Sequence, residues 1–222
     1  MITDFTFLRF LKNLKFFTLK MKYCKIYACI LISCFSHFLS LAQNCKPDYS
    51  TLDKITKEQN DTWSSLLFSP NFGQRMMQNS NESIYASIIR SGNINKIAVV
   101  LIRTQEEKNA SNVTQYKAVK GNVFYFGVMN GSSLKFITDE VSNTSDVYGS
   151  IGVNTYTLYS YIKDESLNAL KDSLTAKPID AVRILLEDGI TIDQSVKEKE
   201  GNKMKQKSNC FFSFLEEKGF MK

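Results

Sequence analysis

The sequence predicts an α+β domain with a mainly antiparallel sheet of about six or seven strands, one short helix and a C-terminal helix that covers the sheet. Two observations carry this prediction. Runs rich in isoleucine, valine and aromatic residues come in pairs separated by short turns that contain glycine, which is typical of β-hairpins. A leucine-bearing helix and a long charged helix follow, without the regular alternation of strands and helices that a parallel sheet requires.

The first part of the chain after residue 43 is polar and then apolar. Residues 44–61 carry few apolar side chains, so we expect an extended arm. Residues 62–68 form a short, mostly apolar run that ends before Pro70, and this pattern predicts a strand followed by a loop.

A first hairpin is predicted by residues 83–90 and 96–103, which flank Gly92. Its second strand contains the run 97–102, which is apolar without alternation. Such a run predicts a strand covered on both faces, so we expect it in the middle of the sheet.

A second hairpin is predicted by residues 123–129 and 134–137, because the pair Asn130-Gly131 suits a type I′ turn in which both central residues need a positive φ. Residues 138–152 are polar and predict a loop of about fifteen residues. Loops of that length often carry function, so this segment is a candidate binding region.

Residues 155–162 alternate, which predicts a strand with Tyr156 and Leu158 on one face and Tyr159 and Tyr161 on the other. A helix begins near Asp164, residues 179–187 predict a strand that turns at Gly189, and a charged helix is expected from residue 194 to about residue 214. The side chains expected to face the core in these later elements are Leu167, Leu170, Leu174, Val182, Ile184, Leu186, Val196, Met204, Phe211 and Leu215.

The beginning of the chain predicts a secretory leader. Lys22 and Lys25 precede an apolar run, and Ser40 and Ala42 place small residues at −3 and −1 of a cleavage site. The expected organisation is a leader, 1–42, that includes a signal peptide, 21–42, followed by a single α+β domain, 43–222.

Two alternatives remain open for this leader. Residues 31–34 resemble a lipobox with Cys34 as the lipidated residue, although the apolar run continues to Leu41, where a lipoprotein would change to a polar tether. An uncleaved anchor is the other alternative, although the run is shorter than the roughly 20 residues that a membrane span needs.

Cleavage after Ala42 would remove the sole histidine, His37. A Ser-His-Asp triad, a Cys-His pair and zinc sites built on imidazole would then be excluded. The leader also holds six of the 28 basic residues and one of the 22 acidic residues, so 22 basic and 21 acidic residues would remain. Such a balance argues against binding to nucleic acid.

Cysteine use is consistent with export. Cys24, Cys29 and Cys34 lie in the leader, which leaves Cys45 and Cys210. In an oxidising compartment this pair most simply forms one disulfide that closes nearly the whole domain. Two free thiols and an intermolecular link are the alternatives.

Five residues are candidate ligand contacts. Asp139 and Glu140 lie in the polar segment 138–152 and, with Asp146 of the same segment, offer oxygen ligands for calcium or paired carboxylates, although solvated loop acids are commoner. Tyr159 and Tyr161 suit stacking on a carbohydrate or contact with a partner, as do Tyr125 and Tyr156, although tyrosine is also a common strand residue.

Arg183 is the fifth candidate. Together with Arg90 and Arg103 it would offer guanidinium groups to a carboxylate or phosphate. Arg183 has apolar neighbours on both sides, and the interpretation we favour for it is an ion pair with an acid across the sheet. The sequence supports no catalytic residue, metal ligand or cofactor.

Several features together resemble the small secreted proteins of unknown function that are abundant in Bacteroidota. The features are a leader that ends in Ser40-Leu41-Ala42-Gln43, Cys45 just inside the domain, Lys120-Gly121 before an aromatic strand with an Asn-Gly turn, the segment 179–183 after a leucine-bearing helix, and a late Cys210. The resemblance implies a Gram-negative envelope or extracellular location, and it brings no catalytic residues.

The function expected from the sequence is a secreted or periplasmic binding or interaction module for an unknown protein or glycan. We expect no membrane span in the mature chain, and the sequence does not predict an oligomeric state. One alternative is a histidine-free hydrolase that uses two carboxylates on a glycan, and another is a structural lipoprotein anchored in the envelope.

Overall fold

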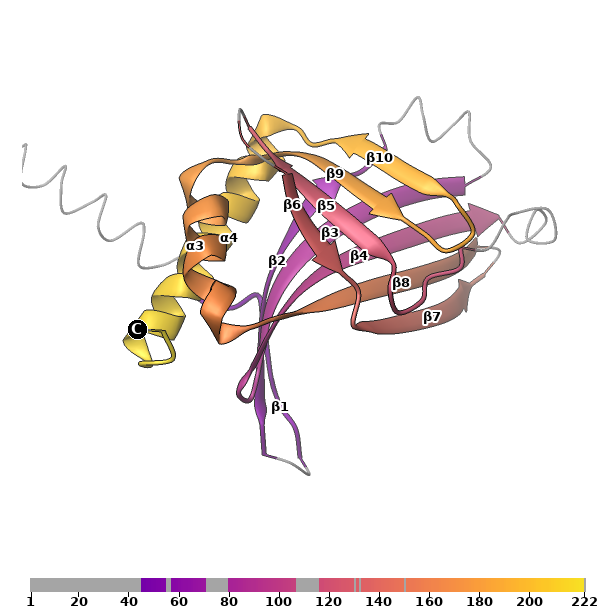
Figure 1. Cartoon of the computed structure of the whole chain (residues 1–222). Coiled ribbons are helices and arrows are strands. Elements are labelled where there is room, and N and C mark those ends of the chain that lie inside the picture. Colours follow the sequence, from indigo (N-terminus) through magenta and orange to yellow (C-terminus); the bar gives the residue numbers. More distant parts are fainter. Residues whose placement is uncertain are drawn as a thin grey trace, which may run out of the picture. The chain divides into compact units, whose positions relative to one another are not determined.

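The computed structural model describes residues 45–54, 57–70, 80–106, 116–129, 131, 133–149 and 151–221 (Figure 1). The chain divides into two compact units, Met1–Cys45 and Lys46–Lys222, and the second unit contains the helices and strands described below. The predicted leader, with Cys34 and His37, lies outside the described residues. Within the described ranges, no helix is both long enough and apolar enough to cross a membrane.

The predicted α+β class is confirmed, with the strands divided between two antiparallel sheets. The six-stranded sheet A has the order β1 (Tyr49–Leu52), β2 (Gln59–Phe68), β3 (Ser80–Ser91), β4 (Ile94–Glu106), β8 (Ile151–Ile162) and β7 (Glu140–Tyr148). The four-stranded sheet B has the order β10 (Thr191–Ser195), β9 (Ile179–Leu185), β5 (Val123–Val128) and β6 (Ser133–Ile137). The helical elements are the short 3₁₀ turn η2 (Asp164–Ser166), α3 (Leu167–Ala176) and α4 (Glu198–Glu217).

The two strongest hairpin signals are confirmed. β3 pairs with β4 around Gly92, whose φ of 54° is one that residues with a Cβ rarely adopt. β4 lies inside sheet A between β3 and β8, as its apolar run predicts. β5 pairs with β6, and the Gly131 N–H donates to the Val128 carbonyl, whereas Asn130 of the predicted turn lies outside the described residues.

The predicted loop over residues 138–152 is wrong. Residues Glu140–Tyr148 form β7, which pairs along its whole length with β8. β7 is an edge strand with most of its residues exposed, so it lacks the apolar alternation that marks a half-buried strand. Its threonine, valine and tyrosine residues are good strand formers, and Gly149 turns the chain with a φ of 65°.

Two other boundaries differ from the predictions. The polar arm contains β1, which forms a hairpin with the start of β2. The C-terminal helix begins at Glu198, because Gln194 and Ser195 still pair with β9 as part of β10.

The core depends on α4, which lies against both sheets (Figure 1). Trp63 of sheet A is fully buried, and the centre of its ring lies 5.4 Å from the ring centre of Phe211 and 5.3 Å from that of Phe214, both on α4. In sheet B, Phe124 and Phe126 are fully buried and pack with Phe136. The side chains that the sequence assigns to the core of the later elements are all buried; they are Leu167, Leu170, Leu174, Val182, Ile184, Leu186, Val196, Met204, Phe211 and Leu215.

Gly201 explains how α4 approaches sheet B. A Cβ at this position would collide with the backbone oxygen of Ile179 at the start of β9. The position is buried inside a helix, where glycine costs about 1 kcal/mol relative to alanine. The close contact between helix and strand therefore requires a residue that helix propensity disfavours.

We expect Gly201→Ala to destabilise the protein by about 1–3 kcal/mol, because the methyl group meets backbone that has little room to move. Urea unfolding followed by the fluorescence of Trp63, the only tryptophan of the chain, measures this change. Asn202→Ala, at the next and exposed position of α4, is the control and should change stability by less than about 0.5 kcal/mol. A Gly201→Ala protein as stable as the wild type contradicts this packing.

The predicted disulfide between Cys45 and Cys210 is confirmed. Near it, the Ser64 N–H donates to Asp48 over 2.8 Å, and the Asp48 carboxylate is also ion-paired with Lys207 of α4. The segment around Asp48 is therefore joined to sheet A by a hydrogen bond and to α4 by an ion pair.

Replacing both cysteines by serine should lower the free energy of unfolding by about 2–5 kcal/mol, because the unfolded chain regains the freedom that a very long closed loop denies it. Thermal unfolding of the double variant beside the wild type measures the loss. Reduction of the wild type should give the same midpoint as the double variant, whereas an unchanged midpoint after complete reduction contradicts a stabilising bridge.

Candidate functional site

The five predicted ligand contacts lie in two places. Tyr159 and Tyr161 lie on β8, Glu140 begins β7 beside them, and Asp139 immediately precedes it. Arg183 lies on β9 in the other sheet. The structure therefore brings four of the five residues together and leaves Arg183 apart from them.

The first place is a polar cluster of Lys96, Glu140, Tyr159 and Tyr161, called here the lysine–tyrosine cluster. Lys96 Nζ lies 2.8 Å from Glu140 Oε2, and the Tyr161 hydroxyl donates to the same oxygen over 2.8 Å. Lys96 Nζ also lies 4.9 Å from the centre of the Tyr161 ring and 5.3 Å from that of Tyr159. These contacts join β4, β8 and β7, so they hold the edge strand to the sheet.

The electrostatics of this cluster follow from the shared oxygen. The hydrogen bonds from Lys96 and Tyr161 lower the pKa of Glu140 and outweigh burial, which acts in the opposite direction. For Lys96, burial acts to lower the pKa, and the hydrogen bond and charge of Glu140 raise it above its ordinary value. The pKa of Tyr161 is raised because its hydroxyl proton is held by Glu140.

Asp139 has a separate structural contact. Its carboxylate accepts the N–H of Tyr161 over 2.8 Å, and its own N–H donates to the Tyr159 carbonyl over 2.8 Å. Both bonds tie the residue to the backbone of β8. The hydrogen bonds and ion pair described for Asp139 and the lysine–tyrosine cluster are all made with other residues of the chain. A ligand role for these residues therefore stays a prediction.

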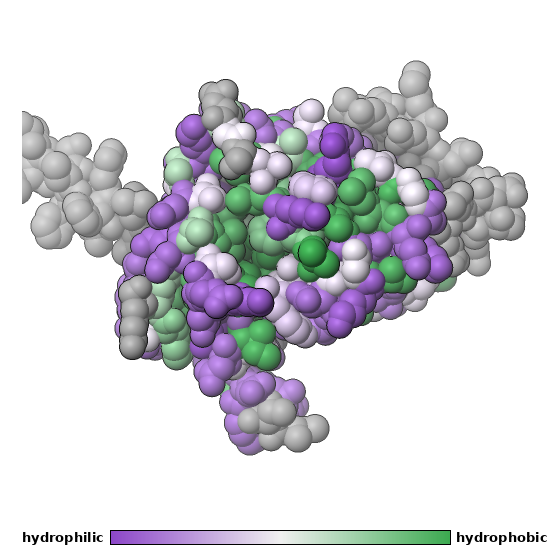
Figure 2. All heavy atoms as spheres, viewed as in Figure 1, coloured by the Kyte–Doolittle hydropathy of each residue, from purple (hydrophilic) through white to green (hydrophobic). Residues whose placement is uncertain are grey.

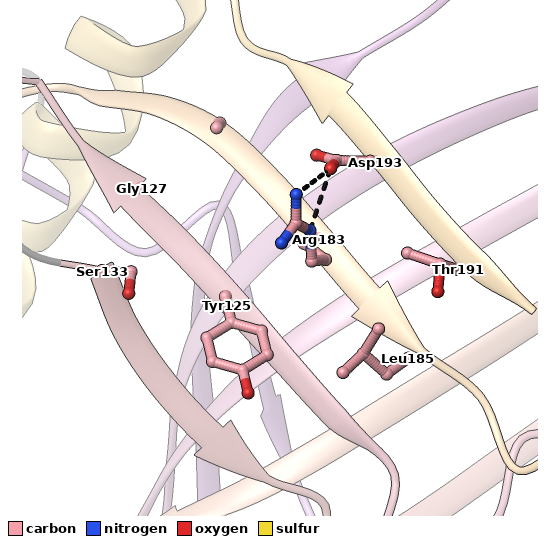
Figure 3. Close-up of a pocket in the computed structure, with 8 residues that line it drawn as sticks. Tyr125, Gly127, Ser133, Arg183, Leu185, Thr191 and Asp193 are labelled. Carbon is pink, nitrogen blue, oxygen red and sulfur yellow. Dashed lines mark hydrogen bonds and ion pairs between the residues drawn. The ribbon is translucent and has the colours of Figure 1, made fainter. Parts of the chain in front are cut away.

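The second place is the outward face of sheet B (Figure 3). Val182 and Ile184 are fully buried, so the alternation of β9 directs Arg183 to the opposite, exposed side. Arg183 lies directly across from Asp193 on β10, and its Nε donates to Asp193 Oδ2 over 2.9 Å while its Nη2 contacts the same oxygen. The predicted ion pair of Arg183 with an acid across the sheet is therefore confirmed.

Around this pair lies a hollow of about 560 Å³, called here the outer hollow. Gly127 lies close to β9 at this hollow, because a Cβ at Gly127 would lie 3.1 Å from the Cβ of Ala181 and 2.8 Å from Asp180 Oδ1. Figure 3 shows the Tyr125 ring on one side of the hollow and the ion pair on the other. The lining residues are Tyr125, Gly127, Ser133, Ala181, Arg183, Leu185, Thr191 and Asp193.

A second hollow of about 540 Å³ lies between β6, α3 and the end of β8, and is called here the β6–α3 groove. Figure 2 shows an apolar area between β6 and α3. The groove contains two of the predicted residues, Asp139 and Tyr161. Its lining residues are Leu134, Lys135, Phe136, Ile137, Asp139, Ser160, Tyr161, Ile162, Lys163, Ser166, Ala169, Leu170 and Ser173.

The three arginines named as possible joint ligands do not converge. Arg90 is buried, donates to the Asn95 side chain over 2.9 Å and lies 4.2 Å from the centre of the Phe220 ring. Arg103 lies toward the other end of β4, where its guanidinium is 4.7 Å from the centre of the Tyr116 ring. Arg183 belongs to sheet B, so each arginine has its own environment.

The calcium hypothesis loses its structural basis, because Asp139, Glu140 and Asp146 do not share a loop. Glu140 and Asp146 are both part of β7, where Asp146 is paired with Val153. Over the described ranges, no three histidine, cysteine, aspartate or glutamate side chains gather as a metal site would require.

Comparison of the chain with known protein families, with curated proteins and with solved structures finds no match. The site is therefore interpreted from its own geometry. Sequence reasoning named Arg183 and considered Tyr125, but it missed Ser133, Thr191 and Asp193. Only the registers of β5 with β6 and β9, and of β9 with β10, bring these residues to one surface.

Lys96→Met should raise the pKa of Glu140 toward its ordinary value, because the strongest of its two hydrogen-bond donors is lost. Carboxyl ¹³C NMR titration of the wild type and the variant measures the shift, with Glu140→Gln assigning the signal. A depressed pKa stabilises the fold above the pKa of the unfolded chain, and this contribution is lost as the pH falls through the folded-state value.

The stability difference between the wild type and Glu140→Gln should therefore be present at neutral pH and absent in strong acid. We expect less than about 1 kcal/mol, because the Glu140 side chain is 45% exposed and solvent screens the pair. A difference that grows as the pH falls contradicts this assignment.

Proposed function

We propose that this protein is a secreted or periplasmic binding module and that the outer hollow binds a saccharide. The observation that carries the proposal is the combination of the Tyr125 ring with the Arg183–Asp193 pair across an open depression of small residues. The hydroxyl groups of Ser133 and Thr191 also line the depression. An aromatic face with polar groups beside it is the arrangement that a ligand with one apolar face and several hydroxyl groups requires.

The Arg183–Asp193 pair supports this choice of ligand. The two side chains are 54% and 48% exposed, so each keeps surface for a ligand while its partner holds it in place. A guanidinium donates and a carboxylate accepts, and together they match sugar hydroxyls, which do both. A pair that is already ordered loses less conformational entropy on binding than two free side chains.

The hydrolase alternative receives less support. Two-carboxylate hydrolysis needs a pair of acids on opposite sides of the bond that is cleaved. The outer hollow is lined by one acid, Asp193, and this acid is ion-paired with Arg183. The β6–α3 groove is also lined by one acid, Asp139, whose carboxylate accepts a backbone N–H.

The location is part of the proposal. A disulfide between Cys45 and Cys210 is compatible with an extracellular or periplasmic compartment. The signal peptide over residues 21–42 and the likeness to secreted Bacteroidota proteins also support export, and they stay predictions. The lipoprotein alternative depends on Cys34, which lies outside the described residues.

The proposal predicts that the purified domain is retained on a glycan array and that Tyr125→Ala weakens the binding of a retained glycan by about tenfold. The reason is the loss of the stacking surface, and isothermal titration calorimetry measures the change. Tyr125→Phe keeps the ring and should bind within about threefold of the wild type. Tyr148→Ala removes a tyrosine on β7 that is 67% exposed and more accessible than the half-buried Tyr125, and it should bind like the wild type.

A glycan array that retains neither the wild type nor the Tyr148→Ala control contradicts the saccharide proposal. Equal loss of binding in Tyr125→Ala and Tyr148→Ala contradicts the assignment of the site. Cleavage of glycans by the wild type would instead support the hydrolase alternative.

A further inference from the structure

We infer that the β6–α3 groove receives an extended peptide segment of a partner protein, which pairs with β6 as an additional strand of sheet B. This inference goes beyond the proposed function, because it concerns a protein partner and a different cavity. It depends on three properties of the described residues: the hydrogen-bonding groups at the edge of β6, the apolar groove beside them, and the charge of the groove.

The edge of β6 offers backbone groups to a new strand. Within the described part of the chain, β6 is the last strand of sheet B and pairs with β5 alone. The Thr138 N–H donates to the Asn122 carbonyl over 2.8 Å, so Thr138 and Asn122 form a hydrogen-bonded pair at the end of the β5–β6 ladder. In an antiparallel ladder, hydrogen-bonded pairs recur at every second residue. By this alternation Leu134 and Phe136 bond to β5, and the N–H and C=O groups of Ser133, Lys135 and Ile137 point away from it.

The other side of the sheet gives the same phase independently. The Leu186 N–H donates to the Ile190 carbonyl, and the Val196 N–H donates to the Asp180 carbonyl. The backbone groups of even-numbered residues of β9 therefore form hydrogen bonds with β10, and those of odd-numbered residues form hydrogen bonds with β5. On β5 the odd-numbered residues are thus bonded to β9, so the even-numbered residues bond to β6. The hydrogen bonds at the β6 edge and those at the β10 edge therefore lead to the same conclusion: the N–H and C=O groups of the odd-numbered residues of β6 point away from β5.

Beside this edge lies an apolar surface that alternate side chains of a strand would cover. Ile137 and Tyr161 line the groove and are 55% and 46% exposed, which is high for large apolar side chains. Leu170 of α3 and Ile162 of β8 continue the same surface. An edge strand that faces a helix across an apolar groove is a geometry suited to strand addition, in which the backbone supplies affinity and side-chain pockets supply specificity.

The charge of the groove indicates the chemistry of the peptide. Lys135 is exposed, and no ion pair is found for it among the described residues. Lys163 faces Glu165 at 3.9 Å, and both side chains are 80% exposed, so this contact is weak. The acid of the groove, Asp139, already accepts the Tyr161 N–H. The groove therefore favours a peptide in which apolar and acidic residues alternate.

The same lysine argues against a second copy of this chain as the occupant. β6 has five residues, and Lys135 is its central residue. Two copies that paired antiparallel through this edge would place the two Lys135 side chains close together, and like charges opposite one another destabilise a strand pair. A lysine in the middle of an edge strand is also a common means of preventing self-association.

The test is a displayed library of peptides about eight residues long in which apolar and acidic residues alternate, selected against the oxidised protein. A selected peptide is then titrated by fluorescence anisotropy. We expect Lys135→Pro to weaken its binding at least tenfold, because proline removes an outward N–H and obstructs the edge. Lys135→Thr keeps the N–H and loses the charge, so it should weaken binding only a few-fold.

A second arm leaves the protein unchanged. The same peptide methylated on the amide nitrogens of one edge should lose binding, and amide hydrogen exchange should slow at Lys135 and Ile137 when the unmethylated peptide is added. Failure to select any peptide, equal binding of the methylated peptide, or protection confined to β7 or β10 overturns the inference. A dimer that Lys135→Pro converts to a monomer would instead identify a second copy as the occupant.

Discussion

The contact of α4 with both sheets is the constraint on which the rest of the structure depends. Trp63 holds sheet A to the helix through Phe211 and Phe214. Gly201 lets the first turn of the same helix rest against the backbone of β9 in sheet B. α3 packs on α4 as well, so the wall of the β6–α3 groove is positioned by the helix that positions the sheets. The buried aromatic rings at these contacts contribute a large apolar area to the core.

Much of this fold was predictable from the sequence, and the reason is periodicity. The apolar positions of β9, α3 and α4 repeat with the spacing of a strand or a helix, and each expected side chain is buried. β7 was missed because an edge strand exposed on both faces has no such period. The division into two sheets was also missed, since local patterns do not report which hairpin pairs with which.

The candidate site was less predictable, because it is made by pairing between strands that are distant in sequence. Arg183 was recognisable as an exposed cation between apolar neighbours, and its ion pair was expected. Its partner Asp193 follows a turn, and Tyr125 reaches the same surface from β5 through the register Tyr125 to Arg183. Asp139 and Glu140 were candidate ligand contacts in a predicted loop, and their contacts within the structure are with β8 and Lys96. Composition reveals which groups are available, and register decides which of them meet.

β6 has a consequence for the molecule as a whole, since both hollows are built on it. Ser133 lines the outer hollow, and the four residues that follow line the β6–α3 groove. A short edge strand held by one neighbour keeps more motion than an interior strand, and any ligand that orders it bears the entropic cost for both sites. A peptide bound in the groove would then raise the affinity of the outer hollow for its ligand, and thermodynamic linkage would require that ligand to raise the affinity for the peptide by the same factor. If ligands bind at both proposed sites, this one five-residue strand would couple the two events without any change of fold.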